Sequence, residues 1–312
     1  MFPKIAKKAF LAPMARITDP AFRSLCKKYG AGMTVTELMN AKGLLQNPEK
    51  IKDICKRADN EDRFAVQLFG SDPKELSQAA KLLEPYCDFI DLNLGCPAYK
   101  ICRVGAGSEL LKNPETVGKI VSSMVNAVNI PITVKTRLGI NDNHTSVFDI
   151  LKIVQDNGAS LLTVHGRTRD QAYSGVANWE TIKQVKEQAE IPIVGNGDIN
   201  SPELFKERLS YSSVDYITIG RAASGNPLLF KQINDFLDSG FYKKYSVNER
   251  LKVFQEYVEL SKEFNTKILL QKLQAQHFTK GLKGAGKVRE QISKSKTSEE
   301  LQNALTSFLN KA

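Results

Sequence analysis

The sequence predicts a (β/α)₈ barrel of the TIM type, followed by a small C-terminal helical domain. Eight short β-rich apolar runs recur along about the first 225 residues, helical stretches separate them, and a helical, charged segment follows. Near-continuous apolar strands that alternate with helices indicate a parallel sheet, and eight such units indicate a closed barrel. A doubly wound sheet is the alternative, but it rarely needs eight repeats and would require an early G-x-G-x-x-G turn, which the chain lacks.

The strands are predicted from runs rich in β-branched and aromatic residues. In chain order they are FLAPM (10–14), MTVTEL (33–38), FAVQLFG (64–70), FIDLNLG (89–95), PITVKTRLG (131–139), LLTVHGRT (161–168), PIVGNGDI (192–199) and YITIGRA (216–222).

Helices are predicted between these runs because the segments have helical periodicity, and several open with Asp, Asn or Ser and a nearby proline. The examples are DPAFRSLCKKYG (19–30), DPKELSQAAKLLEPY (72–86), NPETVGKIVSSMVNAV (113–128), SVFDILKIVQDNGA (146–159) and NWETIKQVKEQA (178–189).

The C-terminal part has helical spacing of Leu, Phe and Tyr, which indicates a bundle that packs on itself. Its helices are expected at 248–278, 287–294 and 298–311. We therefore predict two domains, a barrel over residues 1–240 and a helical domain over residues 241–312. A chain of 312 residues has room for one large and one small domain.

The positive charge is concentrated in the helical domain. The formal charge is +10 overall, and residues 241–312 hold 14 Lys or Arg against 7 Asp or Glu, whereas the first 240 residues hold 30 against 27. An excess of seven positive charges on a short segment would attract a polyanion such as nucleic acid. A solvated, lysine-rich helical surface is the alternative interpretation, and charge alone does not separate the two.

Neither membrane insertion nor export is expected. No apolar stretch is long enough to cross a bilayer, and the first residues, MFPKIAKKAFLAPM, lack the apolar core of a signal peptide, so we expect a cytoplasmic protein. The five cysteines form no C-x-x-C pair and no zinc-finger spacing. Their odd number in a cytoplasmic chain favours free thiols, and no metal site is expected.

Polar residues gather where the predicted strands end. In a (β/α)₈ barrel the active-site groups project from the carboxyl ends of the strands and from the following loops. Every strand but the first ends in a polar or ionisable residue, so we expect a catalytic site at this mouth. The strand-end residues are Pro13-Met14, Glu37, Gln67, Asn93 with Cys96, Lys135 with Arg137, His165 with Arg167, Asn196 with Asp198, and Gly220-Arg221.

The last two strands end in GNGDI and IGRA, which favours phosphate binding. Glycines let the backbone approach a ligand closely, and exposed N–H groups can hold a phosphate. Phosphate sites after the seventh and eighth strands are common in this fold. A Gly-Asn turn alone has ordinary structural uses, but Arg221 on the next strand adds a bidentate partner suited to phosphate.

Several stretches resemble the flavin-dependent tRNA-dihydrouridine synthase family. They are LAPMARITDPAFR, VQLFGSDP, DLNLGCPAYKICRVGAGSELL, VKTRLG, HGRTRDQAYSGVANW, GNGDI and IGRAASGNP, spread over about residues 10–230. The resemblance implies FMN at the mouth of the barrel, NADPH (or NADH) as electron donor, and a helical domain that helps to hold tRNA. No obligate protein partner is evident from the sequence. Ser108 stands where the family usually has Ala.

The resemblance makes Cys96 the catalytic acid. Reduction of the C5=C6 bond of a uridine needs a hydride at C6, for which N5 of the reduced flavin is the donor, and a proton at C5. Negative charge develops at C5 and O4, so a positioned acid must quench it. Cys96 lies between Gly95, which allows a turn, and Pro97, which stiffens it.

The other roles also follow from matched positions. Lys135 resembles the family lysine beside the N1–C2 end of the flavin, where positive charge stabilises the reduced ring. His165 resembles a flavin-contacting histidine, and Gln67 resembles the amide at the ring edge. Pro13 and Met14 would form a backbone wall behind the ring. The expected ribityl and phosphate residues are Asn196, Gly197, Asp198, Gly220 and Arg221, and the expected contacts to uracil and nearby RNA phosphate are Asn93, Lys100, Arg137 and Arg167.

Two other functions remain open on the residues alone. One is an FMN-dependent, dihydroorotate dehydrogenase-like enzyme that acts on a free pyrimidine, against which the basic C-terminal segment and the LGCP and HGRT stretches count. The other is a tRNA-binding barrel without catalysis, which the presence of Cys96, Lys135 and His165 disfavours.

Overall fold

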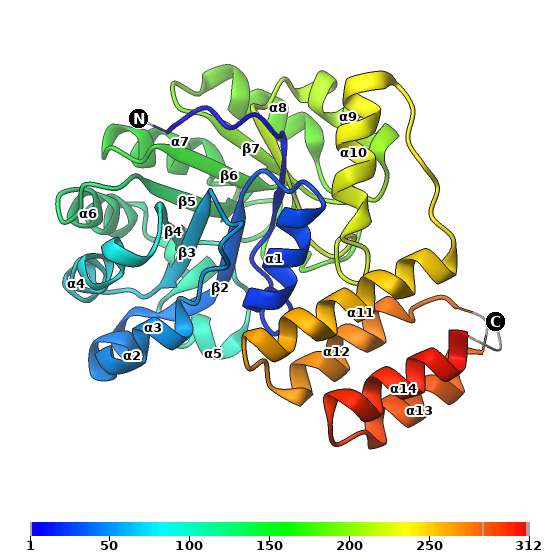
Figure 1. The fold of residues 1–312 in the computed structure, drawn as a ribbon. Helices are drawn as coiled ribbons and strands as arrows, with labels where there is room; N and C mark the ends of the chain where they lie inside the picture. The colour runs from blue at the N-terminus through cyan, green and yellow to red at the C-terminus, as the bar shows by residue number, and fades with distance from the viewer. Residues whose placement is uncertain (1, 283, 310–312) are drawn as a thin grey trace.

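A computed structural model describes residues 2–282 and 284–309 and confirms the predicted barrel (Figure 1). All eight strands form where the sequence places them, most of them shorter than the apolar runs. They are β1 (Ala9–Leu11), β2 (Thr34–Asn40), β3 (Phe64–Phe69), β4 (Phe89–Asn93), β5 (Ile132–Arg137), β6 (Leu161–His165), β7 (Ile193–Asn196) and β8 (Tyr216–Ile219).

Every strand pairs in parallel with its neighbour in the order β1-β8-β7-β6-β5-β4-β3-β2. Backbone hydrogen bonds join the two ends of this sheet. The N–H of Leu11 donates to the carbonyl of Met33 at 2.9 Å, and the N–H of Gly32 donates to the carbonyl of Ala9 at 2.7 Å. The sheet therefore closes on itself, as a (β/α)₈ barrel requires.

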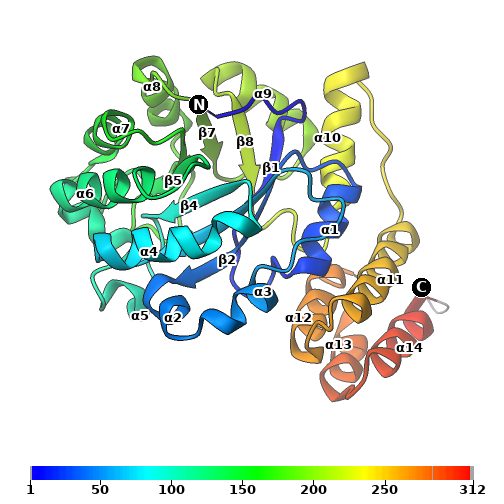
Figure 2. The same ribbon diagram turned by 60° about the vertical axis from the view of Figure 1, so that its left-hand side comes forward.

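Helices surround the barrel, and their N-termini carry the predicted caps. Asp19 accepts from the N–H of Phe22, Asp72 from Glu75 and Asn113 from Thr116, each immediately before a proline. Figure 2 shows the helices side by side around the strands. They are α1 (Pro20–Lys28), α2 (Ala41–Gln46), α3 (Ile51–Ile54), α4 (Pro73–Leu83), α5 (Tyr99–Cys102), α6 (Pro114–Val125), α7 (Val147–Asp156), α8 (Trp179–Gln188), α9 (Pro202–Ser212) and α10 (Leu228–Ser239), with 3₁₀ turns at Pro48–Lys50, Glu84–Tyr86 and Gly107–Lys112.

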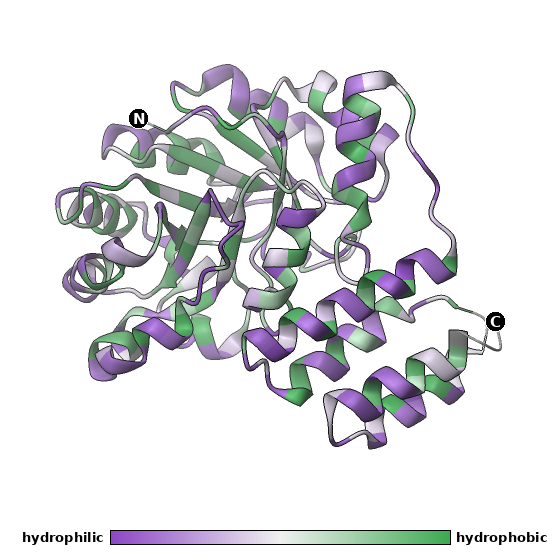
Figure 3. Ribbon diagram, in the orientation of Figure 1, coloured by the Kyte–Doolittle hydropathy of each residue, from purple (hydrophilic) through white to green (hydrophobic). Residues whose placement is uncertain are grey.

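The barrel interior changes from apolar to polar along its axis. At the amino ends of the strands an apolar cluster fills the interior, and Figure 3 shows the strands as largely hydrophobic. Along β4 the inward positions alternate as Phe89, Asp91 and Asn93, because successive side chains of a strand point to opposite faces. Polar side chains therefore collect only toward the carboxyl end, where the site is expected. The apolar cluster comprises Phe2, Ile5, Phe10, Met33, Val35, Ala65, Phe89, Leu161, Val194 and Tyr216.

The C-terminal segment folds into a helical unit of α11 (Val247–Glu263), α12 (Ile268–Phe278), α13 (Ala285–Lys294) and α14 (Ser298–Leu309). The single helix expected over 248–278 is wrong, since the chain breaks between α11 and α12. Asn265 adopts a left-handed φ of 52° there, which an α-helix does not accommodate. Residues 310 and 311 of the last predicted helix lie outside the described residues. Gly240 ends α10, so the proposed boundary at 240/241 falls in the segment that joins α10 to the helical unit.

The helical unit packs against loops at the mouth of the barrel. The hydroxyl of Tyr257 in α11 donates to Asp19 at 3.0 Å. The Gln274 amide in α12 donates to the carbonyl of Ile17 at 2.7 Å. A Cβ atom on Gly225, which follows β8, would lie 2.4 Å from the backbone of His277. The loops after β1 and β8 thus hold the unit beside the strand ends.

Asp19 should make this docking sensitive to pH. Burial raises its pKa from 3.8 to about 6, so the folded state favours the protonated acid. Its contribution to stability is present below about pH 4 and is lost as the pH rises through about 6. Asp19→Asn keeps an acceptor for the α1 cap and should raise the free energy of unfolding by about 1–3 kcal/mol at neutral pH, with little gain at about pH 4. Denaturant unfolding of both proteins across this range measures the difference, and an equal difference at both ends would contradict the assignment.

None of the helices in the described ranges is both long and apolar enough to span a lipid bilayer.

Candidate active site

The strand register brings the predicted site residues together at the mouth. Asn93 on β4 pairs with Lys135 on β5, Arg137 pairs with His165 on β6, and His165 pairs with Asn196 on β7. Four neighbouring strands therefore present these five residues at one end of the barrel.

Lys135 lies at the centre of this group. Its ammonium donates to the amide oxygen of Asn196 at 3.3 Å, and the Asn196 nitrogen donates to the carbonyl of Thr218 at 2.9 Å. Desolvation and the charge of Arg137 lower the pKa of Lys135 to about 8, although the negative charge of Asp91 opposes the shift. The lysine is therefore charged at neutral pH, with an anionic ligand as the natural complement to its charge.

Cys96 lies in a loop that Asn93 and Ser108 hold by four hydrogen bonds. We call residues 94–98 the Cys96 loop. The side-chain oxygen of Asn93 accepts from the N–H of Gly95 at 3.1 Å and from that of Cys96 at 2.9 Å. The Cys96 carbonyl accepts from the N–H of Ser108 at 3.1 Å and from its hydroxyl at 3.0 Å. The hydroxyl of Ser108, which stands where the resembled family usually has Ala, thus adds a hydrogen bond to this loop.

A glycine is required behind the loop. Gly107 has a φ of 61°, and a Cβ atom there would lie 2.7 Å from the Cys96 carbonyl oxygen. Only glycine combines this backbone conformation with so close an approach.

The Cys96 thiol is half-buried. Burial raises its pKa above the ordinary value, and the nearby Cys102 acts in the same direction, whereas Arg137 and Lys135 act against them. The sulfur is therefore a protonated thiol at neutral pH, which is the form that can deliver a proton.

His165 is buried and neutral. Burial and the charges of Lys135, Arg137, Arg167 and Arg221 lower its pKa to about 2. Four cations around a neutral imidazole leave the mouth with an excess of positive charge, which an anion would complement.

Arg137 braces two loops. Its Nε donates to the carbonyl of Gly95 at 2.9 Å, and its Nη1 donates to the carbonyls of Thr168 and Ala172 at 2.8 and 2.9 Å. Its guanidinium lies 5.8 Å from the ring centre of Tyr173. The predicted substrate contact of Arg137 remains a prediction, but the geometry gives this residue a second task, because it ties the Cys96 loop to the β6–α8 loop (residues 166–178).

Arg167 is largely engaged within the protein. Its side chain is only 2% exposed, and it donates to the carbonyls of Ser174 and Gly175 and to the Asp198 carboxylate. Among the described residues its Nη1 has no hydrogen-bond partner. This nitrogen is itself buried, so the predicted contact of Arg167 to RNA remains a prediction.

Asp198 joins two arginines. Its carboxylate accepts from Arg167 at 2.8 Å, from Arg221 at 3.2 Å and from the N–H of Ala177 at 2.8 Å. Both Gly197 and Asp198 have positive φ, at 139° and 56°. If this segment meets a phosphate, the Asp198 carboxylate would hold Arg221 in place rather than touch the phosphate, since like charges repel.

The remaining predicted residues line the rim. A Cβ atom on Gly220 would lie 3.8 Å from the sulfur of Met14, so the ends of β1 and β8 face each other there. Lys100 is exposed on α5, directly after the Cys96 loop. A narrow pocket runs into the barrel below the mouth and is lined by Phe10, Pro13, Met33, Val35, Asp91, Thr133, Lys135, Leu161, Thr163 and Thr218.

Sequence reasoning missed two residues of this site. Asp91 is buried beneath Asn93, and the alternation of β4 would have placed both on the inner face. Tyr173 is 58% exposed, and its ring centre lies 4.8 Å from the Arg221 guanidinium. An exposed aromatic residue within the HGRTRDQAYSG stretch was the available signal.

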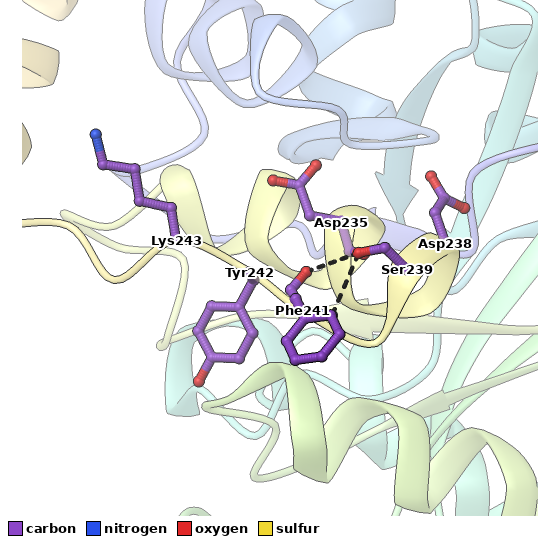
Figure 4. Close-up of a pocket in the computed structure, with 6 residues that line it drawn as sticks. All are labelled: Asp235, Asp238, Ser239, Phe241, Tyr242 and Lys243. Atoms are coloured by element: carbon purple, nitrogen blue, oxygen red, sulfur yellow. Dashed lines mark hydrogen bonds between the residues drawn. The ribbon is translucent and has the colours of Figure 1, made fainter.

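A second, shallow pocket lies at the end of α10, away from the strand ends (Figure 4). Asp235, Asp238, Ser239, Phe241, Tyr242 and Lys243 line it, and none of the predicted site residues takes part.

Comparison with known proteins gives a family and close relatives. The family model described as "Dihydrouridine synthase (Dus)" matches residues 10–312. The tRNA-dihydrouridine synthase B of Xanthomonas axonopodis pv. citri (strain 306) is 42% identical over 237 residues, which cover 76% of this chain and 71% of the relative. The enzyme of that name from Pasteurella multocida (strain Pm70) is 39% identical, with 84% and 79% covered. That of Escherichia coli (strain K12) is 40% identical, with 76% and 74% covered.

A solved structure shares the fold. Histamine dehydrogenase from Rhizobium sp. 4-9 superposes with a TM-score of 0.57 at 14% identity, over 82% of this chain and 49% of that chain. The chain thus spans about half the length of that structure, and the likeness concerns the fold alone.

Proposed function

This chain belongs to the dihydrouridine synthase family, and from this premise we propose that it reduces the C5=C6 bond of specific uridines in tRNA, with FMN as cofactor and NADPH (or NADH) as electron donor, in the cytoplasm. The observation that carries the proposal is the half-buried Cys96 thiol in a hydrogen-bonded loop beside the cationic mouth of the barrel.

The residues at the mouth fit a phosphorylated flavin. Lys135 makes one long hydrogen bond, Arg167 has an unpartnered buried nitrogen among the described residues, and Arg221 is exposed beside Gly220. An anionic group would complement this excess of positive charge.

We assign the cofactor contacts by matched position in the family. Gln67, Lys135 and His165 would face the ring system, and Pro13 and Met14 would close its far side. The ribityl chain and phosphate would lie on Asn196, Gly197, Asp198, Gly220 and Arg221. When bound, FMN would supply the hydride that C6 of the uracil ring receives.

Cys96 would supply the proton. Addition of hydride at C6 leaves negative charge at C5 and O4, and transfer of the thiol proton to C5 completes the reduction. The raised pKa keeps this proton in place at neutral pH. The resulting thiolate would lie near Lys135 and Arg137, whose charges stabilise it until a proton from solvent restores the thiol.

Asn93, Lys100, Arg137 and Arg167 are the proposed contacts to uracil and adjacent phosphate. The helical unit would hold the body of the tRNA, because its basic composition suits a polyanion and it lies beside the mouth. A uridine within a folded tRNA must leave its stack to reach the site, so recognition would rest on shape and an extruded base.

The rate of reduction should fall at alkaline pH. Because the pKa of Lys135 is lowered to about 8, its charge is lost above that value, and turnover should decline about tenfold per pH unit beyond it. In Lys135→Arg the charge persists, so the alkaline decline should move upward by at least about one pH unit. Single-turnover rates across the range measure both profiles. A decline at the same pH in both proteins would assign it to another group.

The function is tested by supplying purified protein and NADPH with either unmodified tRNA or orotate. We expect a yellow protein with flavin absorbance that forms dihydrouridine in tRNA and does not oxidise NADPH with orotate. Turnover of orotate without change in tRNA would favour the free-pyrimidine alternative. The absence of turnover with tight tRNA binding would favour a non-catalytic tRNA-binding protein.

A further inference from the structure

A buried carboxylate lies two residues before Asn93 on β4. Asp91 is only 4% exposed, and each of its oxygens accepts one hydrogen bond. The Thr133 hydroxyl donates to Oδ1 at 2.7 Å, and the Gln67 amide nitrogen donates to Oδ2 at 2.7 Å. Gln67 and Thr133 are both buried as well.

The contacts continue from this carboxylate to the Cys96 loop. The Gln67 oxygen accepts from the Asn93 amide nitrogen at 2.8 Å. The Asn93 oxygen accepts from the N–H groups of Gly95 and Cys96 at 3.1 and 2.9 Å. Two side-chain amides therefore link Asp91 to the backbone of the residue that carries the thiol.

The orientation of the Gln67 and Asn93 side-chain amides is fixed by the groups at the two ends of this series of hydrogen bonds. Backbone N–H groups can only donate, so Asn93 must turn its oxygen toward the loop and its nitrogen toward Gln67. Gln67 must then turn its nitrogen toward residue 91, where an acceptor is required. Burial raises the pKa of Asp91, whereas the hydrogen bonds from Thr133 and Gln67 and the charge of Lys135 favour its ionised form. As a carboxylate Asp91 can only accept, so it and the two loop N–H groups together permit one arrangement of both amides.

We propose that Asp91 is a positioning residue: through the oriented amides of Gln67 and Asn93, its carboxylate holds the Cys96 loop in the geometry that aims the thiol. This inference deepens the proposed function, on which its catalytic consequence rests. Among the described residues Asp91 makes no hydrogen bond to the Cys96 loop, so its link to the loop passes through the two amides, while its charge also acts on Lys135.

The test separates positioning from general stability. Asp91→Leu removes the acceptor, leaves the Gln67 nitrogen without a partner and should loosen the loop. Asp91→Asn can still offer one oxygen to Gln67 in one of its two orientations, so it should be intermediate. Asp215→Asn is a matched control. Asp215 directly precedes β8 at its amino end, away from the mouth, and accepts from Lys186 and from the N–H of Ile193 in β7.

The first readout is alkylation of Cys96 by iodoacetamide, resolved by peptide mass spectrometry without tRNA or NADPH. We expect a rate about tenfold higher in Asp91→Leu, about threefold higher in Asp91→Asn, and unchanged in Asp215→Asn. Labelling of the buried Cys26 in the native protein reports unfolding. If Asp91→Leu unfolds by this criterion, the Asp91→Asn rate decides. If the variant that decides alkylates at Cys96 at the same rate as the parent protein, the proposal is overturned.

The second readout is the division between kcat and KM. If the Cys96 thiol is displaced from its position against the substrate, kcat should fall by about 10²-fold in Asp91→Leu, while KM for tRNA changes by less than about threefold. Alkylation requires no turnover, so the two proposals fail separately. Absence of dihydrouridine with the parent protein would reject the enzymatic function, whereas unchanged alkylation in both Asp91 variants would reject the positioning role.

Discussion

Cys96→Ala is expected to lower turnover by about 10²–10⁴-fold while the protein keeps its flavin colour and its affinity for tRNA. In the proposed mechanism the thiol beside Lys135 and Arg137 is the proton donor, and burial raises its pKa. Alanine retains the backbone, so the hydrogen bonds from the loop N–H groups to Asn93 should persist. The fold should therefore be intact in a variant that lacks the acid.

The measurement is single-turnover formation of dihydrouridine in tRNA, with flavin absorbance and tRNA binding recorded on the same samples. Cys102→Ala is the matched control, because it removes a second half-buried thiol near the same loop. We expect it to retain turnover within about threefold of the parent protein. If Cys96→Ala also reacted at that rate, the sulfur would not be the acid.

Lys135→Met should produce the second largest loss, about 10²–10³-fold in turnover. Its ammonium lies among the polar residues at the carboxyl ends of the strands, where it donates to Asn196. It is charged at neutral pH despite its lowered pKa. Methionine fills a similar volume without the charge, so the effect should come from lost electrostatic stabilisation of developing negative charge. The loss should be largest near neutral pH and should shrink above about pH 8, where the parent lysine is itself neutral.

Turnover of both proteins from neutral to alkaline pH tests this expectation. Lys119→Met removes the same charge from the exposed face of α6, where Lys119 pairs with Glu115, and should leave turnover unchanged. If the loss of turnover in Lys135→Met were the same at neutral and at alkaline pH, the Lys135 side chain would act through its shape rather than its charge.

The strands and the ring of strand-end residues were predictable because their signal is local. Alternation along a strand assigns each residue to one face, and the barrel fold brings the carboxyl ends together. The amino-acid sequence is therefore sufficient to place Asn93, Lys135 and His165 at one mouth, and the strand register confirms that they are neighbours.

The contacts among these residues were not predictable. Which amide meets which acceptor depends on the stagger of the closed barrel, so nothing in the sequence pairs Gln67 with Asp91. Arg137 and Arg167 bind carbonyl oxygens, which every residue possesses and which leave no trace in the sequence. The break at Asn265 was missed because asparagine in a helical pattern is a weak signal.

Mapping of dihydrouridine in tRNA from cells that lack this protein tests the central claim most directly. The account predicts that a defined set of uridine positions loses the modification, that expression of the parent protein restores it, and that expression of Cys96→Ala at the same level does not. An unchanged dihydrouridine map, or full restoration by the alanine variant, would contradict it.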